Sequence, residues 1–139
     1  METKKIKNLI RGILSSETRL SLRKECVNIG YECHLDVVSR EQENGEYFLV
    51  GYIVTHRAFP HMKEDHRYVQ HIFKLLYELE RIPAKRRVLI FADSTLYGKF
   101  NKWYPVRDRR GVEIRCIDLS EMSAGQGKRH EKKRWADSG

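Results

Sequence analysis

The sequence lacks any long hydrophobic run, because no apolar stretch approaches the roughly 20 residues that a membrane-spanning helix needs. It also lacks the features of a secretory signal, since charged residues interrupt the apolar segment between Ile6 and Leu14. We therefore expect a protein without a membrane segment, located in the cytoplasm or, in a nucleated host, in the nucleus.

Cysteine is scarce as well. Cys26, Cys33 and Cys116 are odd in number, have no C-x-x-C spacing and stand among apolar neighbours. This pattern predicts buried thiols in a reducing compartment, and its spacings give no support for a zinc site. Hydrophobic residues make up 40% of the sequence and charged residues 33%, which is typical of one soluble domain with a modest core.

Positive charge is unevenly distributed along the chain. The net charge is +8, yet residues 1–80 carry twelve Lys and Arg against twelve Asp and Glu, whereas residues 81–139 carry fifteen against seven. Basic side chains neutralise phosphates and aromatic rings stack on bases, so we expect the second half to bind DNA or RNA. A basic face that only maintains solubility is the alternative. The residues expected to contact phosphates are Arg86, Arg87, Lys99, Lys102, Arg109 and Arg110, and those expected to stack on bases are Tyr97 and Trp103.

Hydrophobic periodicity predicts an alternation of helices and strands. Ser15 and Ser16 are typical of an N-cap, and Asn44-Gly45 is typical of a hairpin turn. The predicted elements are, in chain order, helices over 6–14 and 17–28, strands over 31–39 and 46–55, a helix from Glu64 or Asp65 to Pro83, a strand over 88–92, a helix or ordered loop over 94–104, and a strand over 112–119.

This order predicts one α/β domain over residues 1–122. We expect a three-layer-like sandwich with a mixed sheet, in which an antiparallel hairpin is followed by a crossover helix. The strand over 46–55 is apolar almost throughout, which favours the centre of the sheet. Residues 123–139 have no apolar face and are predicted to form a basic, disordered tail.

A helix ending in Gly30-Tyr31, a strand containing Asp36, a hairpin, a second strand, a helix and a third strand follow one another along residues 17–92. This order resembles the core of the PD-(D/E)XK, or restriction-endonuclease-like, superfamily, whose nucleases hold Mg²⁺ with carboxylates. The resemblance implies that Asp36 and Glu46 are metal ligands on the two strands. It also implies that Glu25, or else Glu17, is a catalytic helix glutamate.

The second strand departs from the Asp/Glu-x-Lys pattern of that superfamily. Residues 48–52 read Phe-Leu-Val-Gly-Tyr, Glu46 is the only acid of the strand, and a lysine would have to come from the next helix, as Lys74. We therefore predict a nucleic-acid-binding protein with an incomplete catalytic site. The alternatives are a Mg²⁺-dependent nuclease using Glu25, Asp36 and Glu46, and a non-catalytic assembly subunit that binds a partner protein or a second copy.

Residues 46–54, the following helix and residues 85–90 also resemble the C-terminal half of the tRNA-splicing endonucleases. Those enzymes cleave with Tyr, His and Lys and without metal. Glu46 stands in the region where their histidine would fall, so this resemblance implies a non-catalytic subunit.

Two further groups are candidate sites. Asp93 and Ser94 follow a buried strand, where open α/β sheets bind ligands, but a helix N-cap is the favoured interpretation. A second hypothesis is a metal site that uses His56, His61 and Asp65, with a solvated, pH-sensitive loop as its alternative. The histidines concerned recur every five residues, as His56, His61, His66 and His71.

Overall fold

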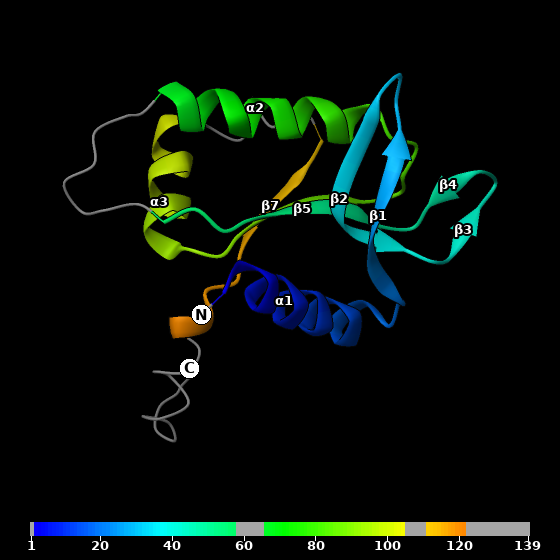
Figure 1. The fold of residues 1–139 in the computed structure, drawn as a ribbon, viewed down its shortest axis with the longest axis horizontal. Coiled ribbons are helices and arrows are strands. Elements are labelled where there is room, and N and C mark those ends of the chain that lie inside the picture. The colour runs from blue at the N-terminus through cyan, green and yellow to red at the C-terminus, as the bar shows by residue number, and fades with distance from the viewer. Residues whose placement is uncertain (1, 58–65, 105–110, 122–139) are drawn as a thin grey trace.

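Five strands form one mixed sheet in the order β1-β2-β5-β6-β7 (Figure 1). The computed structural model describes residues 2–57, 66–104 and 111–121, with the side chains of residues 66, 67 and 103 left out. The predicted mixed α/β sheet is confirmed. Its antiparallel part comprises β1 (Leu22–Asn28), β2 (Glu32–Ser39) and β5 (Val50–Val54), and its parallel part continues from β5 to β6 (Arg87–Phe91) and β7 (Glu113–Cys116).

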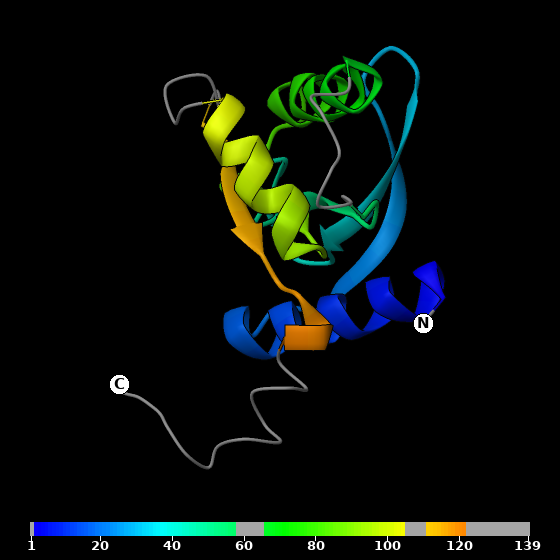
Figure 2. The ribbon, with the colours of Figure 1, turned by 90° about the vertical axis from the view of Figure 1, so that its left-hand side faces the viewer.

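Helices cover both faces of this sheet, which gives three layers (Figures 1 and 2). α1 (Thr3–Thr18) buries Ile10 and Leu14 against one face, while α2 (His66–Glu80) and α3 (Ser94–Trp103) cover the other. The apolar stripe of α2 and the buried residues 88–91 of β6 agree with their predicted periodicity. None of the helices in the described ranges combines the length and hydrophobicity that crossing a bilayer requires.

β5 lies at the centre of the sheet, as its composition predicts, and all five of its residues are buried. Gly51 is needed there because β6 approaches its backbone closely. A Cβ at Gly51 would lie 2.5 Å from the carbonyl oxygen of Val88 and 2.6 Å from its Cγ1. The glycine therefore marks a close backbone approach in a dense strand.

The Asn-Gly turn is confirmed, but the strand predicted after it is divided in two. Asn44 and Gly45 have φ of 53° and 80° and join β3 (Gln42–Glu43) to β4 (Glu46–Tyr47) in a separate two-stranded sheet. Between β4 and β5, the buried hydroxyl of Ser39 accepts the backbone N–H groups of residues 48 and 49. The hydroxyl thus satisfies two backbone donors beside the backbone hydrogen bond from Ser39 to the carbonyl of Leu49 at 2.9 Å.

The helix predicted over residues 17–28 is wrong. α1 continues through Ser15, whose hydroxyl donates to the carbonyl of Leu20 instead of capping a new helix, and it ends at Arg19 with φ of 61°. Residues 22–28 instead form β1, which pairs with β2 at six positions. The ladder with the next strand overrides the local helical signal.

The remaining predicted elements fall close to their expected positions. Residues 94–103 form the helix α3, with Asp93 as its N-cap, and the last strand is shorter than expected, ending at Cys116. Glu64 and Asp65, expected to cap the helix before Pro83, lie outside the described residues, as does the tail over 123–139.

Replacing Gly51 with alanine is expected to destabilise the fold by about 1–3 kcal/mol, because the added methyl group would collide with backbone atoms of β6. Gly12→Ala is the matched control, since Gly12 lies in α1 and a Cβ there meets nothing within 4 Å. Alanine at that helical position is expected to stabilise by about 0.5–1 kcal/mol. Denaturant unfolding measures both changes, and equal effects would contradict the close approach.

Candidate functional site

Asp36 lies at an irregularity in the pairing of β1 with β2. The register shifts between Arg23 and Glu25, where β2 has one residue more than β1. Such a bulge re-aims the side chains next to it. As a result, Asp36 and its neighbour Val37 both face the α1 layer, where Val37 is fully buried in the core beneath α1.

Both carboxylate oxygens of Asp36 have partners. Oδ1 is 2.9 Å from the Nζ of Lys7, and Oδ2 accepts the backbone N–H of Ile53 at 2.8 Å. Arg11 donates through Nε to the backbone carbonyl of the same residue at 2.8 Å. The side chain is only 14% exposed, so a metal ion could reach it only by displacing the lysine.

The other two predicted carboxylates have separate partners. Glu25 lies on β1, not on a helix, and pairs with Arg23 at 2.6 Å. Glu46 lies on β4 and is 4.0 Å from Lys85. Glu25 and Asp36 line one cavity of about 340 Å³, which Glu46 does not line. The three acids therefore do not form one cluster of free carboxylates, and the helix assignment of Glu25 is corrected.

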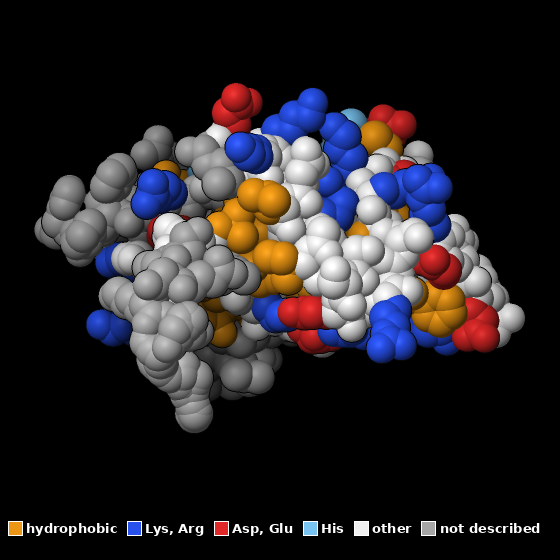
Figure 3. All heavy atoms as spheres, turned by 90° about the horizontal axis from the view of Figure 1, so that it is seen from below, with side chains coloured by type: hydrophobic (Ala, Val, Ile, Leu, Met, Phe, Trp, Pro, Cys, Tyr) orange, Lys and Arg blue, Asp and Glu red, His pale blue; other side chains and the backbone are white. Residues whose placement is uncertain are grey.

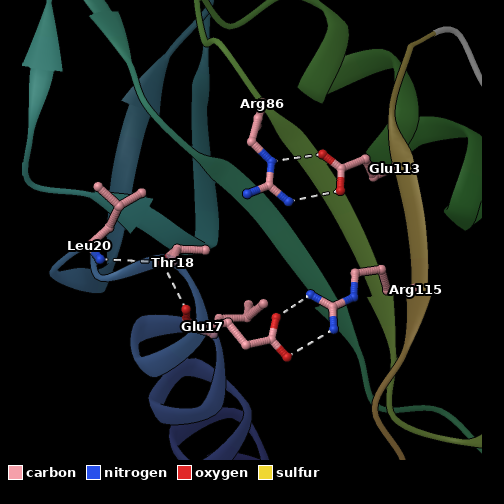
Figure 4. A network of polar contacts seen from close by, with 7 residues as sticks. Glu17, Thr18, Leu20, Arg86, Glu113 and Arg115 are labelled. Atoms are coloured by element: carbon pink, nitrogen blue, oxygen red, sulfur yellow. Dashed lines mark hydrogen bonds and ion pairs between the residues drawn. The ribbon is translucent and has the colours of Figure 1, made fainter.

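Two arginines near the edge strand β7 are held in bidentate ion pairs (Figure 4). Arg86 donates to both carboxylate oxygens of Glu113 at 2.9 Å, and Arg115 donates to those of Glu17 at 2.7 and 3.1 Å. The hydrogen bond from Arg86 lowers the pKa of Glu113, and the one from Arg115 lowers the pKa of Glu17. One pair connects α1 to β7 and the other connects β7 to the residue before β6, so Arg86 stabilises the fold.

Neighbouring cations also serve the fold. Arg87 donates to the carbonyl groups of Leu79 and Ile82 at 2.8–3.2 Å, which satisfies backbone acceptors at the end of α2. Lys85 is 3.0 Å from Glu43 on the small hairpin. The cluster that follows Pro83 is thus used for intramolecular contacts, and phosphate contacts by Arg86 and Arg87 would compete with them.

The remaining predicted nucleic-acid contacts lie on or after α3. Lys102 is exposed in the last turn, Lys99 is half-buried and has a partner, and the half-buried ring of Tyr97 lies 5.9 Å from that of Phe91. The side chain of Trp103, together with Arg109 and Arg110, falls outside the described part of the chain.

Most of the Lys and Arg side chains that form no ion pair or hydrogen bond within the described ranges lie near the N-terminus. The count along the sequence had instead placed the positive excess after residue 80. Residues 2–40 carry five such side chains, whereas α3 carries only Lys102. Figure 3 shows the α1 face, with Lys and Arg side chains around a central hydrophobic patch. The five whose side chains make neither an ion pair nor a hydrogen bond with another described residue are Lys4, Lys5, Arg19, Lys24 and Arg40.

A buried carboxylate that sequence reasoning missed lies on α2. Glu78 is 4% exposed and accepts hydrogen bonds from Tyr52 on β5 at 2.5 Å and from Tyr31 at the hairpin tip at 2.9 Å. Lys74 lies 3.8 Å away. The network fastens the hairpin of β1 and β2 to α2. The hydrophobic periodicity of α2 does not predict that Glu78 is buried, because Glu78 lies next to the stripe of core residues.

Two of the four histidines in the predicted series, His56 and His71, are in ring contact. The His56 ring centroid is 5.2 Å from Tyr68 and 5.6 Å from His71. Desolvation lowers the pKa of His71. His61 and Asp65, the other members of the hypothesised metal site, lie outside the described residues.

The favoured N-cap interpretation of Asp93 is confirmed, because its carboxylate accepts the N–H of Leu96 at 3.0 Å. Asp93 also lines a cavity of about 360 Å³ at the carboxyl ends of the parallel strands, together with Arg57 and Asp118. Asp118 accepts the N–H of Ser94 at 2.9 Å. Both carboxylates of the cavity thus cap backbone groups.

Comparison with known proteins gives no match: no family model fits the chain, and no curated sequence or solved structure is significantly similar to it.

Replacing Tyr52 with phenylalanine is expected to lower the free energy of unfolding by about 1–3 kcal/mol, because a buried carboxylate oxygen loses its donor. Tyr31→Phe removes a hydroxyl from the same carboxylate, but Tyr31 is 47% exposed and water can replace it. Denaturant unfolding should therefore show a smaller decrease for Tyr31→Phe. Equal decreases would contradict the role of burial.

Stability should also depend on alkaline pH through Tyr31. The hydrogen bond to Glu78 raises the pKa of Tyr31 from 10.0 to about 12. A pKa raised by folding means that the stabilisation is complete below pH 10 and disappears as the pH rises toward 12. The difference in unfolding free energy between wild type and Tyr31→Phe should shrink over this range, and a constant difference would contradict the assignment.

Proposed function

We propose that the chain is a nucleic-acid-binding protein of restriction-endonuclease-like order whose catalytic site is incomplete. The order helix, antiparallel hairpin, central strand, crossover helix and parallel strand supports this proposal. α1 takes the place of the helix expected over residues 17–28. Asp36 lies on the strand of the hairpin that pairs with the central strand.

The contact between Lys7 and Asp36 carries the proposal. In a metal-dependent nuclease, carboxylates converge on Mg²⁺ and a metal-bound water is activated. Here the ammonium group of Lys7 lies 2.9 Å from the carboxylate, and the backbone of Ile53 occupies the other oxygen. The neighbouring strand β5 supplies neither an acid nor a lysine. The arrangement favours binding over cleavage.

The binding surface that we assign lies on the α1 side of the molecule. Lys4, Lys5 and Lys24 are exposed there and make no ion pair with another described residue, so they are available for phosphates. Lys7 and Arg11 add positive charge around Asp36. Contacts of this kind neutralise a polyanion without reading sequence, and they suit both DNA and RNA.

Affinity for nucleic acid should fall steeply as the salt concentration rises. The combined variant Lys4→Gln, Lys5→Gln, Lys24→Gln is expected to reduce the slope of log K against log salt. On duplex DNA the reduction should be about 0.9 for each phosphate that the variant no longer neutralises. Fluorescence anisotropy with labelled duplex and single-stranded DNA and RNA measures this slope.

Lys24→Gln and Lys85→Gln form a matched pair, because each removes one exposed positive charge but only Lys85 is ion-paired, to Glu43. The first should weaken binding and the second should change it little. Absence of salt-dependent binding to every probe would overturn the proposal and favour the assembly subunit. Mg²⁺-dependent cleavage that disappears in Asp36→Asn would contradict the incomplete site.

A further inference from the structure

Three side chains with metal-binding atoms lie together on the hairpin of β1 and β2: Cys26, Glu32 and His34. Cys26 is paired directly with His34, and Glu32 lies two residues before His34, opposite Asn28. Directly paired residues and those two positions along a strand project from the same face of a sheet. The ladder therefore holds all three on one exposed face of the hairpin.

The distances suit a small cation. The Sγ of Cys26 lies 3.0 Å from the Nδ1 of His34, and the ligand atoms of the three residues all lie within 4.8 Å of one another. In a tetrahedral zinc site, bond lengths of about 2.3 Å to sulfur and about 2.0–2.1 Å to nitrogen place these ligand atoms about 3.5 Å apart. Small side-chain rotations are sufficient to reach this geometry.

The donor set selects the metal. A thiolate, an imidazole and a carboxylate are ligands of Zn²⁺, whereas Mg²⁺ and Ca²⁺ prefer oxygen donors alone. We propose that Cys26, Glu32 and His34 bind one Zn²⁺ ion. Three protein ligands leave the fourth tetrahedral position to water or to another ligand, and the exposure of the cluster gives the ion direct access.

Contacts that do not involve a metal hold the β1–β2 hairpin, which carries the three ligands, in place. Cys33 is buried on the opposite face of the hairpin, and partly buried Val27 packs against the core between the sheet and α2. Tyr31 at the tip donates to Glu78 of α2 at 2.9 Å. A preformed ladder lowers the ordering cost of binding.

The zinc proposal stands apart from nucleic-acid binding, because it uses none of the lysines assigned to phosphates. It also corrects two expectations from the sequence. Cys26 is exposed instead of buried, and its zinc partners lie on the next strand, six and eight residues along the chain.

Zinc binding to the full chain is best measured by competition with a chromophoric zinc indicator under reducing conditions. We expect one equivalent per chain. Cys26→Ser and His34→Gln should each weaken binding by more than the roughly 10–100-fold typical of removing an outer-shell partner. With Co²⁺ as the probe, a thiolate-to-cobalt charge-transfer band should appear in the wild type and be absent in Cys26→Ser.

Cys116→Ser and His56→Gln are the matched controls, since these residues lie outside the cluster, and they should bind zinc like the wild type. Far-UV circular dichroism verifies that each variant is folded. We expect the variants at Cys26 and His34 to fold because both side chains are exposed. Failure of the folded wild type to bind one equivalent would overturn the proposal. Unchanged affinity in the double variant Cys26→Ser, His34→Gln would also overturn it.

Discussion

Asp36 joins three parts of the structure through one side chain and one carbonyl. Its carboxylate accepts the N–H of Ile53 in β5 and forms an ion pair with Lys7 in α1, and its carbonyl accepts a hydrogen bond from the Nε of Arg11. β2 pairs with β5 at only two positions, so the side chain continues the hydrogen bonding where the ladder stops. The same contacts fasten α1 to the sheet. A carboxylate already committed in this way is poorly suited to hold a catalytic metal.

Local burial made much of the fold predictable. β5, β6 and α2 are dense in apolar residues at the spacing of their own structure, and Asn44-Gly45 specifies its turn by its backbone preference. β1 was not predictable in this way. Its residues are mostly polar and only partly buried, and the strand exists because β2 supplies its partners. The bulge that re-aims Asp36 arises from the same pairing, so the sequence alone could not place its carboxylate.

The location of unpaired positive charge was also not predictable from the sequence alone. Counting residues places the positive excess after residue 80, but in the described part of that segment Lys85, Arg86 and Arg115 are already paired with carboxylates. Arg86 meets Glu113 at a separation of 27 residues, and Arg115 meets Glu17 at a separation of 98. Such pairs are invisible to a count along the chain. The charge available to a partner depends on what folding leaves unpaired, and Lys24, which lines the same cavity as Asp36, has no ion pair among the described residues.

The wrong prediction of a helix over residues 17–28 also explains why the zinc ligands were missed. A helix there would not pair Cys26 with the strand that carries Glu32 and His34. Pairing across the hairpin brings them together on the side of the sheet that faces α1. A thiolate and a carboxylate each carry one negative charge, so a bound Zn²⁺ ion leaves the cluster neutral. Without metal, Glu32 adds a negative charge to the hairpin whose other strand carries Lys24. Zinc binding would therefore make this side of the sheet more favourable for a polyanion, although the two sites share no residue.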